Sequence, residues 1–132
     1  MSSPDAGLVA AILANATVIS LVGTRVYHGE RPQTSILPAI AWKRSGVQRE
    51  MLLDGPSGMA TAYYELEVIA ETSAQSRTIA DAVRSAVHGV TGNLGGATVR
   101  LAMVTTELDV SDVDGDLKVR HVLMDIEIIF PE

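Results

Sequence analysis

The sequence contains no cysteine and few aromatic residues. The missing thiols exclude a disulfide scaffold, a thiolate zinc site, an iron–sulfur cluster and a cysteine nucleophile. Aromatic residues make up 4% of the chain and hydrophobic residues 47%, so we expect a core of Ala, Val, Ile, Leu and Met. A chain of 132 residues can bury enough of this apolar surface to fold without a metal or a disulfide.

Basic runs and long apolar runs are also missing. The net charge is −6 and the pI is near 4.9, and DNA repels such a surface unless its few cations are clustered. The longest early apolar run, residues 8–14, is too short to cross a bilayer, and the first residues lack the basic patch of a signal peptide. We therefore expect an acidic globular protein in an aqueous compartment, with no membrane partner.

Residues 1–132 are predicted to form a single domain, which begins with a helix. The segment 3–5, Ser-Pro-Asp, is typical of an N-cap, a first helical position and an acidic first turn. Leu8 and Ile12 continue at helical spacing, and Asn15 can cap the end of the helix. After it we expect an apolar link at 16–22, a short strand at 24–27 and a loop at 28–38.

The middle of the chain predicts a hairpin and then a second helix. A strand at 39–49 leads to a turn at 53–58 and to a strand with strict alternation around Leu66. Thr72 and Gln75 form a capping-box pattern before the second helix, whose apolar stripe is Ile79, Val83, Ala86, Val87 and Val90. We expect its opposite face to be solvated and to carry i,i+4 charge pairs: Arg77, Asp81, Arg84 and His88.

The last part of the chain predicts another hairpin. A flexible glycine-rich loop at 89–96 precedes a strand at 97–107, an acidic turn at 109–116 and a strictly alternating strand at 117–130. Two helices cannot cover both faces of such a sheet. The expected fold is therefore α+β: a mostly antiparallel sheet of about four strands, with two helices packed on one face.

Motifs that would indicate an enzyme or a cofactor are missing. In the acidic turn, placing Gly115 at the sixth position of a calcium loop puts Val110 and His121 where carboxylates are required. His28 and His88, like His121, have no partner at metal-ligand spacing. The glycine-rich segments match neither a nucleophile elbow nor a phosphate loop. We predict no catalytic residue, no cofactor site, no metal site and no enzymatic activity.

Several short motifs, taken together, resemble those of a known family. They are an N-terminal Ala-rich helix, residues 21–27 (Leu-Val-Gly-Thr-Arg-Val-Tyr), residues 37–38 (Leu-Pro), residues 53–58 (Leu-Asp-Gly-Pro-Ser-Gly), residues 67–70 (Glu-Val-Ile-Ala) and the helix 80–87. In this order and spacing, over nearly the whole chain, they resemble the phage tail-completion family. This family, long filed as a domain of unknown function, contains the tail terminators of long-tailed phages and prophages.

The resemblance implies a structural role in the virion. A ring, usually of six subunits, would cap the tail tube, stop its polymerisation and join the head connector. The implied partners are other copies of the chain, the major tail tube protein and the head–tail connector proteins. DNA would pass through the lumen without specific binding. The implied location is the head-proximal end of the tail, after assembly in the cytoplasm of the bacterial host. The alternatives are a head–tail connector or other minor virion protein and, third, a small-molecule-binding domain.

Two sets of apolar residues are candidates for subunit or tube contacts. On the last strand, Leu123 and Ile129 share a face with charged residues, so this face is too apolar for solvent and too charged for a core. The second set flanks the turn after the first long strand: Met51, Leu52, Leu53 and Met59. Either this tip folds back over its own sheet, or it docks on a neighbouring subunit or on the tail tube.

Overall fold

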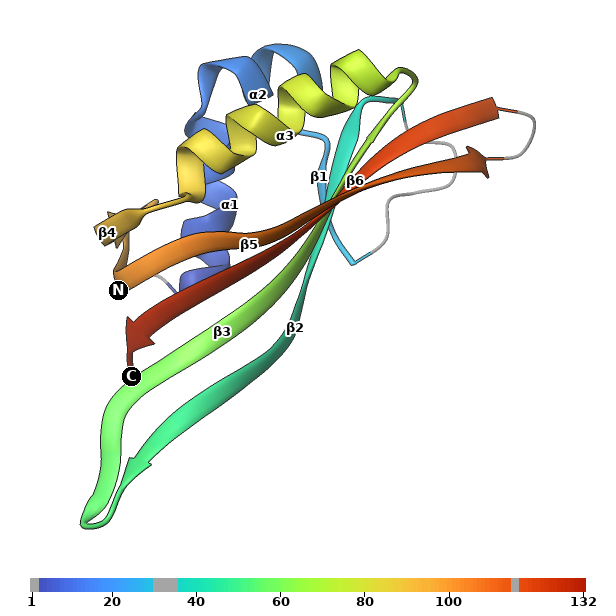
Figure 1. The fold of residues 1–132 in the computed structure, drawn as a ribbon. Coiled ribbons are helices and arrows are strands. Elements are labelled where there is room, and N and C mark those ends of the chain that lie inside the picture. Colours follow the sequence, from blue (N-terminus) through green and yellow to red (C-terminus); the bar gives the residue numbers. More distant parts are fainter. Residues whose placement is uncertain (1–2, 30–35, 115–116) are drawn as a thin grey trace.

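The computed structural model describes residues 3–29, 36–114 and 117–132. It confirms the α+β class: a curled six-stranded sheet carries three helices on one face (Figure 1). The strand order is β1-β2-β3-β6-β5-β4, and all neighbours are antiparallel except β1 and β2. The helices are α1 (Pro4–Ala14), α2 (Ala16–Val22) and α3 (Ser73–Val87). The strands are β1 (Val26–His28), β2 (Ala39–Leu52), β3 (Gly55–Ala70), β4 (Val90–Leu94), β5 (Ala97–Asp114) and β6 (Leu117–Pro131).

The expected sheet of about four strands and two helices was too small: the short strand near 24–27 joins the sheet as β1, and one further strand, β4, and one further helix, α2, were not predicted. The apolar link at 16–22 is α2. Asn15 caps it: its side-chain oxygen accepts the backbone N–H groups of Thr17 and Val18 at 3.0 and 3.2 Å. The glycine-rich loop at 89–96 contains β4, which forms a hairpin with β5 because Gly95 and Gly96 adopt positive φ in the tight turn.

Two predicted turns are shorter than expected. The turn at 53–58 consists of Leu53 and Asp54 only, and β3 begins at Gly55 with φ +140°. In the acidic stretch, β5 continues to Asp114, and residues 115–116 lie outside the described residues. Both differences lengthen hairpins, so the sheet reaches further from the helices than the sequence indicated.

The core lies between the helices and the covered face of the sheet. Leu8, Ile12, Val83 and their apolar neighbours pack against alternate residues of β3 and β6, such as Leu66 and Met124, all essentially buried. The predicted caps of α1 and α3 are confirmed. The Ser3 hydroxyl accepts the Ala6 N–H at 3.2 Å, and the Thr72 hydroxyl accepts the Gln75 N–H at 3.1 Å. The alternation found in the sequence therefore places one side of each long strand in this core.

Helix α1 packs against the β4–β5 turn with no room for a side chain. A Cβ added to Gly7 would lie 2.4 Å from the Leu94 carbonyl oxygen and 2.6 Å from the Ala97 Cβ. On the other side, a Cβ on Gly95 would lie 2.2 Å from the Gly7 carbonyl oxygen. This contact requires glycine and fixes α1 against the edge hairpin.

Candidate assembly interfaces

The hairpin tip, residues 50–58, extends beyond the rest of the sheet (Figure 1). Its two strands pair only with each other, because β6 ends beside Met59, which pairs with Pro131. Met51 is 67% exposed, Leu52 54% and Leu53 fully exposed, and Met59 at the base is partly buried. The tip therefore does not fold back over its own sheet, which was the first of the two alternatives.

An ion pair holds the base of this tip. The Arg49 Nε and Nη2 atoms donate to the Glu132 carboxylate at 2.7–2.9 Å, and the Glu132 N–H donates to the Gly58 carbonyl at 2.7 Å. The hydrogen bond from Arg49, more than its charge, holds the pKa of Glu132 below its usual range. The pair links β2 to the residue that follows β6 at the base of the tip.

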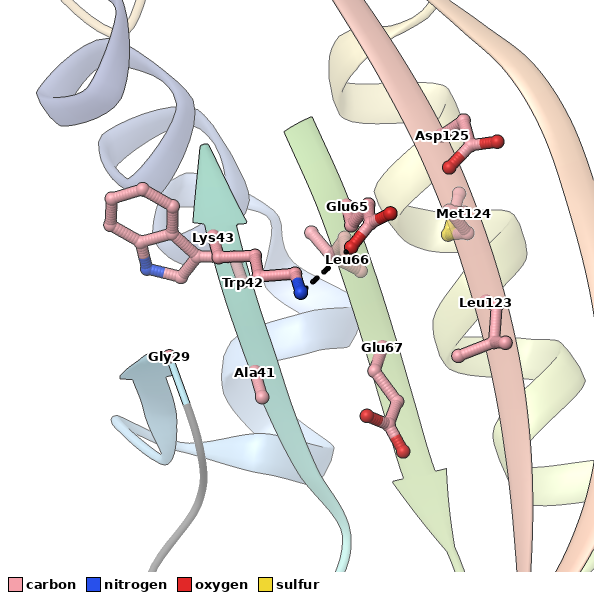
Figure 2. Close-up of a pocket in the computed structure, with 10 residues that line it drawn as sticks. All are labelled: Gly29, Ala41, Trp42, Lys43, Glu65, Leu66, Glu67, Leu123, Met124 and Asp125. Carbon is pink, nitrogen blue, oxygen red and sulfur yellow. Dashed lines mark ion pairs between the residues drawn. The ribbon is translucent and has the colours of Figure 1, made fainter. Parts of the chain in front are cut away.

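The open face of the sheet, the one without helices, carries mostly acidic and aliphatic residues. The register places Glu65 directly opposite Asp125, and the Lys43 Nζ lies 3.1 Å from the Glu65 carboxylate. Figure 2 shows these side chains around a shallow depression of about 400 Å³, with Glu67 and Leu123 beside them. Lys43, Glu65 and Asp125 are exposed, Glu67 is half-buried, and the depression lies on an open sheet surface. This geometry gives no enclosed site for a small molecule.

The predicted residues of the last strand lie on this open face. Leu123 is 39% exposed and pairs with Leu108 of β5, which is 56% exposed, whereas Ile129 is partly buried beside Leu101. Val110, 37% exposed, continues the apolar surface next to Leu108. The predicted interface residues thus form two separate regions, the hairpin tip and the open face. Leu108 and Val110 were not predicted as interface residues, because the strand was expected to end at residue 107 and an acidic turn to follow at 109–116.

The charged face of α3 is largely exposed to solvent, as predicted, but its side chains also contact β5, which was not predicted. Arg77 forms ion pairs with Glu107 and Asp109 of β5, and Arg84 pairs with Glu107 at 3.4 Å as well as with Asp81 at 3.3 Å. His88 accepts the Val104 N–H at 3.0 Å. Strand β5 passes beneath this face of the helix, so these side chains connect the helix to the sheet.

Other titratable groups have structural partners. Burial raises the pKa of Tyr64 far above its usual range, and the hydrogen bond that its hydroxyl donates to Asp5 adds to the effect. This hydroxyl stays protonated and ties α1 to β3. The His121 Nδ1 donates to Glu67 on the neighbouring strand, and His28 stacks on Trp42 with ring centroids 4.4 Å apart.

The described ranges contain no group of three His, Asp or Glu side chains that could hold a metal ion. Most of the acidic stretch considered for calcium falls where side chains are not described. No single helix among the described residues is long and apolar enough to cross a membrane. Helices α1 and α2 meet such a criterion only as a pair bent by 82°. The predictions that no metal and no membrane are involved stay predictions.

Comparison with known proteins agrees with the resemblance in the sequence. A chain in a solved structure, "Virion of native gene transfer agent (GTA) particle", superposes with a TM-score of 0.78 at 16% identity, over 98% of this chain and 96% of that one. A search of curated proteins gives no match. The model of the family "Tail completion protein gp17" matches residues 6–130. The chain therefore belongs to the tail completion protein gp17 family, whose members are structural components of virions and not enzymes.

Proposed function

We propose that this protein is the tail terminator: a homohexameric ring that caps the finished tail tube, stops its polymerisation and presents the surface to which the head connector binds. Its place is the head-proximal end of the tail, after assembly in the host cytoplasm. The observation that carries the proposal is the exposed apolar hairpin tip. Met51, Leu52 and Leu53 extend into solvent beyond the sheet, and a protein that acted alone would gain nothing from exposing them.

The two predicted interface regions, the hairpin tip and the open face, differ in chemistry and so suit different contacts. The tip residues, with Met59 at the base, supply flexible apolar side chains that adapt to a partner. On the open face, Leu123 and Ile129 lie among carboxylates, the mixture found at the rim of subunit contacts. We assign both sets of residues, those of the tip and those of the open face, to contacts with a neighbouring subunit or with the tail tube.

The acidic charge supports a channel for DNA. Each copy carries a net charge of −6, and a ring multiplies this charge around its lumen. Phosphate groups are repelled by such a field, so DNA would slide through without specific binding. The charge agrees with a passive conduit and opposes a role in gripping the genome.

Electron microscopy of the purified protein, alone and mixed with tail tubes, tests the proposal. We expect rings at one end of each tube, and tubes of uniform length when the protein is present during polymerisation. Binding to filled heads in the absence of tubes would instead identify a head–tail connector. A strict monomer at high concentration that binds neither tubes nor heads would refute both functions.

A further inference from the structure

We propose that copies of this chain associate through the free edges of β2 and β5, so that the sheet continues from one subunit into the next. This inference rests on the proposed ring and specifies how its subunits meet. The β2 edge is defined as residues 43–52 and the β5 edge as residues 105–111. The partner is a second copy of the chain.

Both edges have unpaired backbone in the described part of the chain. Strand β1 pairs only with Ile40, Ala41 and Trp42, so β2 has no neighbour on that side beyond this point. Strand β4 pairs with β5 only as far as Ala102, and the His88 side chain accepts the next outward N–H, that of Val104. Each remaining edge is a row of backbone donors and acceptors that another strand can pair with.

The two edges carry charged side chains and β-bulges, between Arg44 and Gly46 and between Arg49 and Met51 on β2 and between Val104 and Thr106 on β5, but they lack two other usual forms of protection. Natural proteins shield free edges with proline or with very short edge strands. The β2 edge spans ten positions and the β5 edge seven, and no proline occurs in either. Exposed apolar side chains lie along both edges: Met51 and Leu52 on β2, and Leu108 and Val110 on β5. Pairing of the two strands would cover these side chains together with the backbone groups.

The charges on the two edges are opposite in sign. The β2 edge contains Lys43, Arg44 and Arg49 and a single acid, Glu50, whereas the β5 edge contains Glu107 and Asp109 and no cation. Lys43, Arg49 and Asp109 form surface ion pairs inside the subunit, which contribute little and can exchange, whereas Glu107 is largely covered and pairs with Arg77 and Arg84 of α3. Two β2 edges, each with three cations and one acid, repel each other, so the charges favour a contact of the β2 edge with the β5 edge.

Strand direction and position are compatible with this contact. Because β2–β3, β3–β6 and β6–β5 are all antiparallel, β5 runs opposite to β2, and a neighbour in the same orientation adds an antiparallel strand. Leu108 lies at the level of Ala41, whereas Gln48, near the middle of the β2 edge, lies at the level of Leu101. Adjacent copies must therefore be offset by about seven residues, roughly 23 Å along the strands. A ring built in this way has strands inclined to its axis.

Cysteine cross-linking tests this contact on a background without natural thiols. Gln48→Cys is combined with Thr106→Cys and, separately, with Val110→Cys; all three side chains are on the open face, and the two β5 positions bracket the middle of that edge. A short bis-maleimide reaches direct and diagonal cross-strand neighbours, about 5–8 Å apart. Inside one copy, β3 and β6 separate the two positions. The control pair is Gln48→Cys with Ser85→Cys, on the exposed face of α3.

We expect at least one edge pair to give covalent multiples of the 14.0 kDa chain. The single-cysteine variants and the control pair should give no such products. Native mass spectrometry of the same samples reports whether the oligomer exists. Oligomers that give no edge-to-edge product overturn the inference and leave the ring standing. Dimers from either single variant show a two-fold contact and also overturn it. A monomer at every concentration, with and without tubes, refutes the ring itself.

Discussion

Replacing the leucines of the hairpin tip separates a role in assembly from a role in folding. Fully burying a leucine contributes about 1.5–3 kcal/mol. Leu52 is 54% exposed and Leu53 fully exposed, so together they contribute about half of one buried leucine. We predict that Leu52→Ser with Leu53→Ser lowers the free energy of unfolding of the isolated chain by about 0.7–1.5 kcal/mol.

The same double variant should weaken assembly much more. If the tip is buried against a partner, each contact loses at least about 2 kcal/mol, which corresponds to roughly a thirtyfold weaker dissociation constant. Urea unfolding measures the first quantity, and native mass spectrometry over a concentration series, together with tube binding, measures the second. Leu66→Ala, at a position 1% exposed, is the control for a core site and should cost about 2–5 kcal/mol.

Two outcomes would contradict this reasoning. A loss of about 2–5 kcal/mol in the isolated double variant would mean that the tip leucines belong to the core of the folded chain. A stable double variant that forms rings and caps tubes normally would show that the tip has no role in assembly. Only normal folding with weakened assembly agrees with the structure.

Three further predictions concern the fold. Gly7→Ala should destabilise the protein although alanine favours helices by about 1 kcal/mol, because its Cβ meets the Leu94 carbonyl; Gly46→Ala, with open space around it, should be nearly neutral in the same thermal melts. Because the folded pKa of Glu132 is depressed, its pair with Arg49 stabilises the protein above the carboxyl's ordinary pKa and is lost as the pH falls through the folded value. Hydrogen exchange should show lower protection of the Glu132 amide in acid, and Glu132→Gln should abolish this pH dependence. Thermal melts with and without a chelator should coincide, and a large drop on chelation would reveal a metal site.

The α+β class could be predicted from the sequence because its strongest signals are periodic. The alternation around Leu66 and along β6 reports a sheet with one buried face, and the burial of Met124 confirms it. The caps at Ser3 and Thr72 could be predicted because a residue with a side-chain acceptor precedes each helix. These signals are local, so they need no knowledge of the partners in the fold.

The missed elements have no such local signal. Helix α2 has only 7 residues, and Asn15 is both the C-cap of α1 and the N-cap of α2. In the sequence, Asn15 was interpreted only as the end of the first helix, so the start of the second was not recognised. Strand β4 is rich in glycine and is a strand because it pairs with β5. The pairs of Arg77 and Arg84 with β5 depend on which strand passes beneath the helix, which spacing along the chain does not reveal.

The residues of the tip were predicted from the sequence, but their exposure to solvent was not. Met51 and Leu52 were selected because apolar residues flank a turn, and this pattern fits burial as well as projection. The difference depends on where β6 ends, beside Met59, which leaves the tip without a neighbouring strand. The length of one strand thus decides the exposure of residues on another.

The carboxylates of the open face also determine which encounters between free copies fail. Glu65 and Asp125 already oppose each other within one molecule, and Glu67 and Glu127 lie on the same surface. If two copies met through their open faces, carboxylates of both would lie close together in a contact that excludes water, which is strongly unfavourable. Stacked symmetric pairs are thereby discouraged, and the proposed ring would form through unlike surfaces instead. In the proposed ring, such a head-to-tail contact would add one copy at a time and would end only when the last subunit met the first.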